Sequence, residues 1–301
     1  MTAFANRAKD ALVRAGLREV RPVPFASQAD LDLFGDQHAI PVTNPLRAHE
    51  GFLRTRLTPG LLRAVATNQA RGVRQVAIFE VGTTFRMGDP FSEHPKLGFA
   101  LCGPASEGWN DSDRPFDGLD AKGVLEAVLA DLGVGAFEQG EHPGPPFHPG
   151  RGATVTVSGG HAGVFGEVHP RVAAELGIDG RVAIGVLGLL PVSEASVDLV
   201  ELADVPRLPP VRRDLAFVVR IDVPAGDVAA AIRDAGAPEL ARSDLFDVFE
   251  GPPLVEGTRS LAFAVELRDP ARTLTDEEAQ TVIDRIVAHV AASTDAVLRT
   301  V

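Results

Sequence analysis

The sequence has no tyrosine, one cysteine and only 3 lysines among its 301 residues. Cys102 cannot form an internal disulfide, and its apolar setting, LGFALCG, favours a buried structural thiol over a nucleophile. No apolar run approaches the roughly 18 residues of a membrane helix, and the N-terminus lacks the blocks of a signal peptide. These absences argue against disulfide scaffolds, thiol catalysis and membrane partners, and we expect a cytoplasmic protein.

Positive charge is also scarce, since 29 Lys and Arg residues stand against 41 Asp and Glu, for a net charge of −12. Proteins that coat nucleic acids do so with diffuse basic surfaces, so DNA is not an expected partner. Any RNA contact must be local and must depend on a few arginines and on stacking. The length and the 45% hydrophobic content suit two globular domains.

A proline-rich segment, ELADVPRLPPVRRD, divides the chain at residues 201–214. Pro206, Pro209 and Pro210 favour extended backbone and interrupt helices. We therefore predict a first domain over residues 1–200, a linker, and a second domain over 209–301.

Strand and helix patterns of the second domain alternate in the order βαββαβ, which is typical of a ferredoxin-like fold. The last helix begins with a capping box formed by Thr275 and Glu278. The expected elements cover residues 212–220, 224–236, 240–251, 258–269, 275–293 and 296–300.

The strand and helix patterns of the first domain predict an α+β fold with a largely antiparallel sheet. One helix is expected to be N-capped by Thr58 and to end near Gly72. A hairpin is expected to turn at Gly159-Gly160. The other expected elements are helices at 4–15, 116–133 and 170–177 and strands at 19–25, 76–86, 96–103 and 181–190.

Three segments, GLREVRPVPF, FLRTRLTPGLL and VAIFEVGTTFR, resemble the signature elements of a class II aminoacyl-tRNA synthetase core. Working class II enzymes place an Arg and a Glu of the second signature, and an Arg of the third, around ATP. Here Arg86 ends TTFR, but no acid follows in MGDP, and RVAIGVLGLLPV has no arginine after its glycines. ATP's phosphates need such cationic partners, so the resemblance implies a degenerate, non-catalytic copy.

The order of IFEVG, FDGLDAKGVLEAVL, HPGR and GEVHP resembles bacterial phenylalanyl-tRNA synthetase β subunits. PPVRRDLAFVV, LFDVFEGPPLVEGTRSLAFAVEL and RTLTDEEA resemble their ferredoxin-like anticodon-binding domain. The resemblance implies a partner of tRNA(Phe) and of a catalytic α subunit in an α2β2 assembly. That α subunit would hold ATP and magnesium, whereas no cofactor and no catalytic residue are expected in this chain.

Members of that family are two to three times longer, with an RNA-binding module and an editing domain ahead of this region. We expect a truncated form rather than a natural short paralogue. Two alternatives remain: a self-sufficient class II ligase, and a free-standing regulatory or RNA-binding paralogue without a role in aminoacylation.

The family resemblance assigns Asp247, Phe249 and Ser260 to the first anticodon base, a guanine. Asp247 would accept from the base, Phe249 would stack on it, and the Ser260 hydroxyl would reach another edge atom. The family commonly has Tyr at the ring position. Strand alternation places Leu245 on the same face as Asp247 and Phe249. The alternative is that Asp247 is an ordinary polar residue of a strand and that Phe249 belongs to the core.

Four arginines, Arg212, Arg213, Arg259 and Arg272, are candidate contacts to the RNA backbone. Arg213 and Arg272 could equally be ion-pair partners of Asp214 or Asp276, and the sequence does not decide between the two roles.

The apolar face of the N-terminal helix, with Phe4, Ala8, Ala11, Leu12 and Ala15, is expected to lie against another subunit, because an exposed stripe of this length favours association. Three histidines, His148, His161 and His169, lie near turns, but their spacing matches no metal-ligand motif and no metal site is expected.

Overall fold

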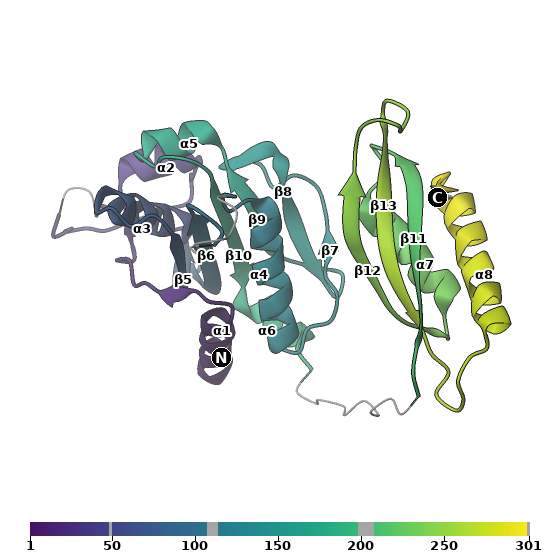
Figure 1. Ribbon diagram of the computed structural model, residues 1–301. Helices are drawn as coiled ribbons and strands as arrows, with labels where there is room; N and C mark the ends of the chain where they lie inside the picture. The colour runs from purple at the N-terminus through teal and green to yellow at the C-terminus, as the bar shows by residue number, and fades with distance from the viewer. Residues whose placement is uncertain (48–49, 107–113, 198–207, 300–301) are drawn as a thin grey trace. The chain divides into compact units, whose positions relative to one another are not determined.

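The structure of the protein is a computed structural model that describes residues 1–47, 50–106, 114–197 and 208–299. The chain forms two compact units, residues 1–201 and 202–301 (Figure 1). Residues 201–207 of the expected linker, with Pro206, lie outside the described residues. Pro209 and Pro210 immediately precede the first strand of the second unit. Among the described helices, none is long and apolar enough to cross a membrane.

A seven-stranded sheet organises the first unit, and all of its pairings are antiparallel except that of β1 with β5. The predicted α+β class and antiparallel sheet are therefore confirmed. In spatial order the strands are β1 (Arg18–Glu19), β5 (Val76–Arg86), β6 (Ser92–Cys102), β10 (Val182–Gly188), β9 (Gly160–Val168), β8 (Phe147–Val157) and β7 (Glu138–Gln139).

Helices cover both faces of this sheet, and successive residues of β6 show it. Phe99 and Leu101 belong to one core cluster, which α1, α4 and α6 share, whereas Ala100 and Cys102 belong to another, which α2, α3 and α5 share. Alternation along a strand therefore divides its side chains between two cores. The helices are α1 (Thr2–Arg14), α2 (Gln28–Phe34), α3 (Thr58–Ala70), α4 (Gly118–Asp131), α5 (Pro170–Glu175) and α6 (Leu189–Ala195).

Three local expectations for this unit are wrong. The strand expected at 19–25 is two short strands in different sheets, because the prolines within it lack the amide donors of a ladder. Its second part, β2 (Phe25–Ala26), joins a small sheet with β4 (Phe52–Leu53) and β3 (Ile40–Pro41).

Thr58 is the first residue of α3 rather than its N-cap, which is Leu57 with no side-chain hydrogen bond. The β8–β9 hairpin turns at Ser158-Gly159, one residue earlier than expected, where φ is 50° and 77°. Positive φ at both central residues is the geometry of a two-residue hairpin turn.

The apolar face of α1 is core, which corrects the expected contact with another subunit. Phe4, Ala8 and Leu12 are buried in the same cluster as residues of α4 and of the sheet. The stripe on which that expectation depended is therefore covered by its own unit and is not exposed to solvent.

We predict that Ala8→Arg destabilises the first unit by roughly 3 to 5 kcal/mol, because Ala8 is 0% exposed and a guanidinium there would be buried without a partner. Val13→Arg on the same helix is the matched control, since Val13 is 56% exposed. Thermal unfolding of both variants tests this. Equal stability of the two would show that this face of α1 is not packed as described.

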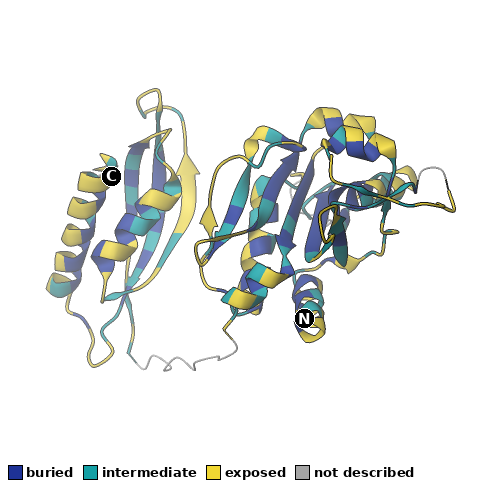
Figure 2. Cartoon of the chain, turned by 180° about the vertical axis from the view of Figure 1, so that it is seen from behind, coloured by how far each residue is buried: buried dark blue, intermediate teal, exposed yellow. Residues whose placement is uncertain are grey.

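The second unit follows the predicted βαββαβ order, with its sheet arranged as β12-β13-β11-β14. Helices α7 and α8 cover one face of the sheet and share one core with it (Figure 1). The dark blue and yellow sides of α8 in Figure 2 show its buried and exposed faces. The elements are β11 (Val211–Arg220), α7 (Ala225–Gly236), β12 (Leu240–Phe249), β13 (Thr258–Leu267), α8 (Asp276–Thr294) and β14 (Val297–Leu298).

The predicted capping box at the start of α8 is present. The Thr275 hydroxyl accepts from the Glu278 amide at 3.2 Å, and the Glu278 carboxylate accepts from the Thr275 amide at 2.9 Å. The Arg272 guanidinium, with the Thr275 amide, lowers the pKa of Glu278 to about 2. The box therefore stays charged and intact through neutral pH.

Replacing Thr275 with Ala should cost about 1 kcal/mol of unfolding free energy, because it leaves the Glu278 amide without an acceptor. The control is Thr281→Ala in the same helix, where the hydroxyl only bonds back to the Glu277 carbonyl. Urea unfolding should find the control as stable as the parent. A Thr275→Ala variant as stable as the control would contradict the cap.

Candidate nucleic-acid interface

The face of the second sheet opposite α7 and α8 is floored by small side chains. Ala262 and Ala264 of β13 lie in its centre, and Ala216 of β11 pairs with Ala262. Ser260 continues the same row of alternate residues, while Leu261 and Phe263 between them point into the helix-side core. A flat ligand can therefore approach the strands closely here.

Two of the predicted site residues project at the edge of this floor. Asp247 of β12 lies beside Ala262, and Phe249 lies beside Ser260. Asp247 is exposed, and its carboxylate makes no hydrogen bond or ion pair with any described residue. Phe249 is 38% exposed, so its ring is not a core residue.

The third predicted residue is less accessible than expected. Ser260 pairs with Val218 on one side and with Phe249 on the other, and is only 4% exposed. Its hydroxyl therefore belongs to the floor of the face and does not project beside Asp247.

An irregularity in β12 corrects the expected grouping of Leu245 with Asp247. Leu245 pairs with Phe263 and Asp247 pairs with Ala262, so the register shifts by one residue at Phe246. The shift places Leu245 opposite a core residue, and Phe246, at the bulge, is 58% exposed. Strict alternation cannot anticipate a bulge, because the extra residue reverses the faces on either side of it.

The four arginines proposed as backbone contacts do not share one surface. Only Arg212 lies in the same alternate row of β11 as Ala216, and its Nε donates to Glu266 at 3.1 Å. Arg213 belongs to the other row and pairs with Asp276 at 2.9 Å, as the ion-pair alternative predicted.

The remaining two arginines serve the unit's own structure. Arg259 Nη2 donates to the Val223 carbonyl at 2.7 Å. Arg272 pairs with Glu278 at 2.6 Å, rather than with Asp214 or Asp276. Of the four, only Arg212 therefore remains a candidate contact on the face of Asp247.

Ion pairs also neutralise much of the charge on this face. Arg212 and Arg268 lower the pKa of Glu266, with Arg268 as the main cause, and Arg242 pairs with Asp244 at 2.5 Å. Unlike Asp244 and Glu266, Asp247 has no cationic partner among the described residues.

In the first unit, a buried ion pair joins the segment before α3 to the sheet. Arg54 Nη1 donates to Glu80 Oε1 at 2.6 Å, and Arg54 Nε donates to the Thr83 carbonyl at 2.8 Å. Burial raises the pKa of Glu80, against the opposing effect of Arg54. Its Oε2 is buried with no hydrogen-bond partner among the described residues. The sequence patterns did not predict this pair, although the acid inside the apolar strand IFEVG marks a buried charge that needs a partner.

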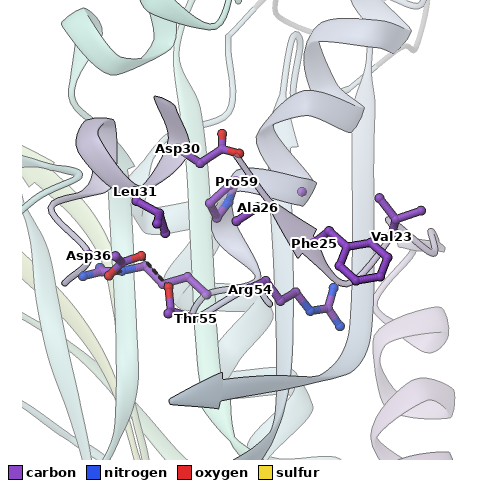
Figure 3. Close-up of a pocket in the computed structure, with 11 residues that line it drawn as sticks. Val23, Phe25, Ala26, Asp30, Leu31, Asp36, Arg54, Thr55 and Pro59 are labelled. Carbon is purple, nitrogen blue, oxygen red and sulfur yellow. Dashed lines mark hydrogen bonds and ion pairs between the residues drawn. The ribbon is translucent and has the colours of Figure 1, made fainter. Parts of the chain in front are cut away.

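A second pair holds the same segment on its other side. Arg56 Nε donates to Asp36 Oδ1 at 2.8 Å, and the Thr55 hydroxyl donates to Asp36 Oδ2 at 2.5 Å. Figure 3 shows Arg54, Thr55 and Asp36 around a cavity of about 10 Å³, which has room for about one water. The segment FLRTRL is thus fixed by its arginines to its own unit.

Comparison with known families matches both units. The profile of the phenylalanyl tRNA synthetase beta chain CLM domain covers residues 2–189, and that of the ferredoxin-fold anticodon binding domain covers residues 206–299. The chain belongs to the phenylalanyl-tRNA synthetase β-chain family. It corresponds to the C-terminal region of that β chain, as the sequence resemblance predicted.

Phenylalanine–tRNA ligase β subunits are similar over nearly all of this chain. The protein from Symbiobacterium thermophilum is 38% identical over 93% of this chain and 32% of its own length. Those from Moorella thermoacetica and Hahella chejuensis are 35% and 33% identical over 92% and 98% of this chain. This chain spans about a third of the length of these relatives, 32% to 37%.

The fold is also that of a class II synthetase. The structure of a pyrrolysyl tRNA synthetase from Desulfitobacterium hafniense superposes with a TM-score of 0.51 at 17% identity, covering 65% of this chain and 69% of that one. At this identity the likeness concerns the fold alone, and it confirms the predicted synthetase-like architecture.

Cysteine and histidine side chains of this β-chain region have structural contacts. Burial raises the pKa of Cys102 to about 11, and Gln69 Nε2 donates to its Sγ at 3.3 Å. His169 caps α5 by accepting from the Arg171 amide at 3.1 Å, and His148 accepts from the Gly150 amide at 3.2 Å. Cys102, His148 and His169 therefore each have a structural contact in their own unit.

We predict that Arg54→Met in this β-chain region costs roughly 3 to 5 kcal/mol at neutral pH, because it leaves the Glu80 carboxylate buried and unpaired. The pKa of Glu80 already lies above its ordinary 4.5 and should rise further. Because the pKa of Glu80 is raised in the folded state, stability falls as pH rises above 4.5. The loss of unfolding free energy caused by Arg54→Met should therefore shrink on acidification.

Urea unfolding at neutral and at mildly acidic pH measures both effects. Arg14→Met is the control, since the Arg14–Asp131 pair is exposed and contributes about 1 kcal/mol or less. A deficit of Arg54→Met that does not depend on pH would show that the charge of Glu80 is not its cause.

Proposed function

We propose that this chain is a non-catalytic region of a phenylalanine–tRNA ligase β subunit, which holds the anticodon of tRNA(Phe) on the open face of the second unit and docks the catalytic α subunit. The observation that carries the proposal is the carboxylate of Asp247, which no described residue pairs, beside the half-exposed ring of Phe249 at the edge of a floor of small residues.

This arrangement suits a guanine better than it suits the RNA backbone. Guanine offers N1 and N2 protons to a carboxylate and a π-face to an aromatic ring, and stacking contributes about 1 to 3 kcal/mol per base. The alanines of the floor leave room for the base to lie close to the strands. Phe249 supplies the stacking surface without the hydroxyl of a tyrosine.

In this proposal, contacts to the RNA backbone contribute less to binding than the contacts to the guanine base. Of the four arginines first considered, only Arg212 lies on the face of Asp247, and Glu266 already pairs with it. Binding should therefore depend weakly on salt for an RNA-binding protein, because few phosphates are neutralised.

Catalysis belongs to the partner in this proposal. The α subunit of an α2β2 enzyme would bind ATP and magnesium and form the adenylate, while this chain holds no cofactor. The motif after Arg86, MGDP, lacks the acid of the second class II signature, and the glycines of RVAIGVLGLLPV lead to no arginine. A role in translation places the assembly in the cytoplasm.

Direct binding of the chain to an anticodon stem–loop RNA of tRNA(Phe) tests the proposal. Asp247→Ala should weaken binding of the guanine-containing loop and should largely abolish its preference over a loop with adenine at the first anticodon position. Phe249→Ala should weaken binding of both loops by about 1 to 3 kcal/mol, because stacking is tolerant of sequence. Fluorescence anisotropy with labelled RNA measures both variants.

The matched control is Asp234→Ala, which removes the same charge from the exposed side of α7 on the covered face of the sheet. It should leave the guanine preference intact. A folded Asp247→Ala variant that still prefers guanine would show that β12 does not contact this base. Binding of the parent without any base preference would instead favour a general RNA-binding paralogue.

A further inference from the structure

The first unit contains a cleft of about 690 Å³ over one end of its sheet, and the role proposed above does not use it. Strands β5, β6 and β10 form its floor, and the segments 35–38, 55–58 and 161–164 contribute to its walls. Clefts of roughly 300 to 1,000 Å³ are typical of sites for small molecules.

Lys96 lies in the floor of this cleft on β6, an interior strand of the sheet. Its neighbours in the adjoining strands, Gly82 of β5 and Gly188 of β10, have no side chains of their own. The paired side chains of Arg54 and Glu80 occupy the space over Gly82. Lys96 makes no hydrogen bond or ion pair with any residue that the structure describes. Lys96 is thus half-buried, and its ammonium group has no partner among the described residues.

Two arginines line the same cleft. Arg56 is held by Asp36 at 2.8 Å, whereas Arg86, at the end of β5, has no partner among the described residues. Burial lowers the pKa of Lys96, and the positive charges of Arg56 and Arg86 lower it further, against the opposing effect of Asp36. The cations are therefore close enough to repel one another.

Carboxylates do not balance this charge. Asp36 is already bound to Arg56 and Thr55. Glu93 also lines the cleft, but alternation along β6 directs it to the opposite face from Lys96. Among the residues that line the cleft on the side of Lys96, three cations stand against one carboxylate. The adjacent Arg54–Glu80 pair is balanced, so an excess of about two positive charges remains.

Apolar side chains form another wall of the cleft, with Phe147, Val164 and Val186 among them. A ligand that fills the space therefore combines an anionic group with an apolar body. A phosphate monoester, which carries up to two negative charges, matches the excess charge better than a carboxylate, with one, or a triphosphate, with about four.

We propose that this cleft binds a small organic phosphate monoester, with its phosphoryl group at Lys96 between Arg56 and Arg86 and its apolar body against Phe147, Val164 and Val186. The phosphoryl group provides the negative partner that Lys96 lacks among the described residues.

Isothermal titration calorimetry of the whole chain with phenyl phosphate tests the proposal. Phenyl phosphate should bind more tightly than inorganic phosphate, which lacks the ring, and more tightly than benzoate, which has one charge. Lys96→Met and Arg86→Gln should each weaken its binding by roughly ten- to a hundredfold, the usual effect of losing a charged hydrogen bond.

Arg71→Gln is the charge-matched control, because Arg71 is exposed at the end of α3 and does not line the cleft. It should bind phenyl phosphate as the parent does. Lys96→Met should also unfold at the same or a higher temperature than the parent without ligand, since it removes an uncompensated, half-buried charge. A purely structural role of Lys96 would lower that temperature instead.

Three results would overturn the proposal. The first is that the folded parent does not bind phenyl phosphate, and the second is that the folded Arg86→Gln and Lys96→Met variants bind it as tightly as the parent does. The third is that benzoate binds as tightly as phenyl phosphate. Arg86 is exposed at a strand end, so its variant keeps the test decisive if Lys96→Met does not fold.

Discussion

Alternation of side chains along antiparallel strands is the constraint on which both units depend. In the first unit it divides β6 between two helix-covered cores, so that a ligand can reach the sheet only where the helices end. In the second unit it directs Leu261 and Phe263 into the helix-side core and leaves Ala262 on the open face. The proposed RNA surface and the proposed phosphate cleft both lie where a sheet face is uncovered.

Positive charge is scarce in this chain, so charged side chains that form ion pairs can be distinguished from those that have no partner among the described residues. Several arginines, such as Arg54, Arg213 and Arg272, form ion pairs that join segments of their own unit. Against that background, the unpaired side chains of Asp247 and Lys96 mark surfaces whose charges the described part of the chain does not satisfy. The surface at Asp247 favours a ligand with hydrogen-bond donors, and the surface at Lys96 favours an anion.

Much of the fold could be predicted from the sequence where local signals agree with burial. Strand β5 has the predicted bounds because its apolar run ends in polar residues, and α8 begins where its capping box indicates. The short strands β2, β3 and β4 could not be predicted, because two residues carry no periodicity. The Arg54–Glu80 pair joins residues 26 positions apart, and no local pattern shows such a contact.

The sequence by itself determined the family, the α+β class and the βαββαβ order, because these follow from motifs and from the period of the apolar residues. Tertiary structure decided which side chains share a face. The bulge at Phe246 separated Leu245 from Asp247, and packing within the unit buried Phe4 and Leu12. Both outcomes depend on strand pairing and on contacts between distant segments, which local sequence patterns do not specify.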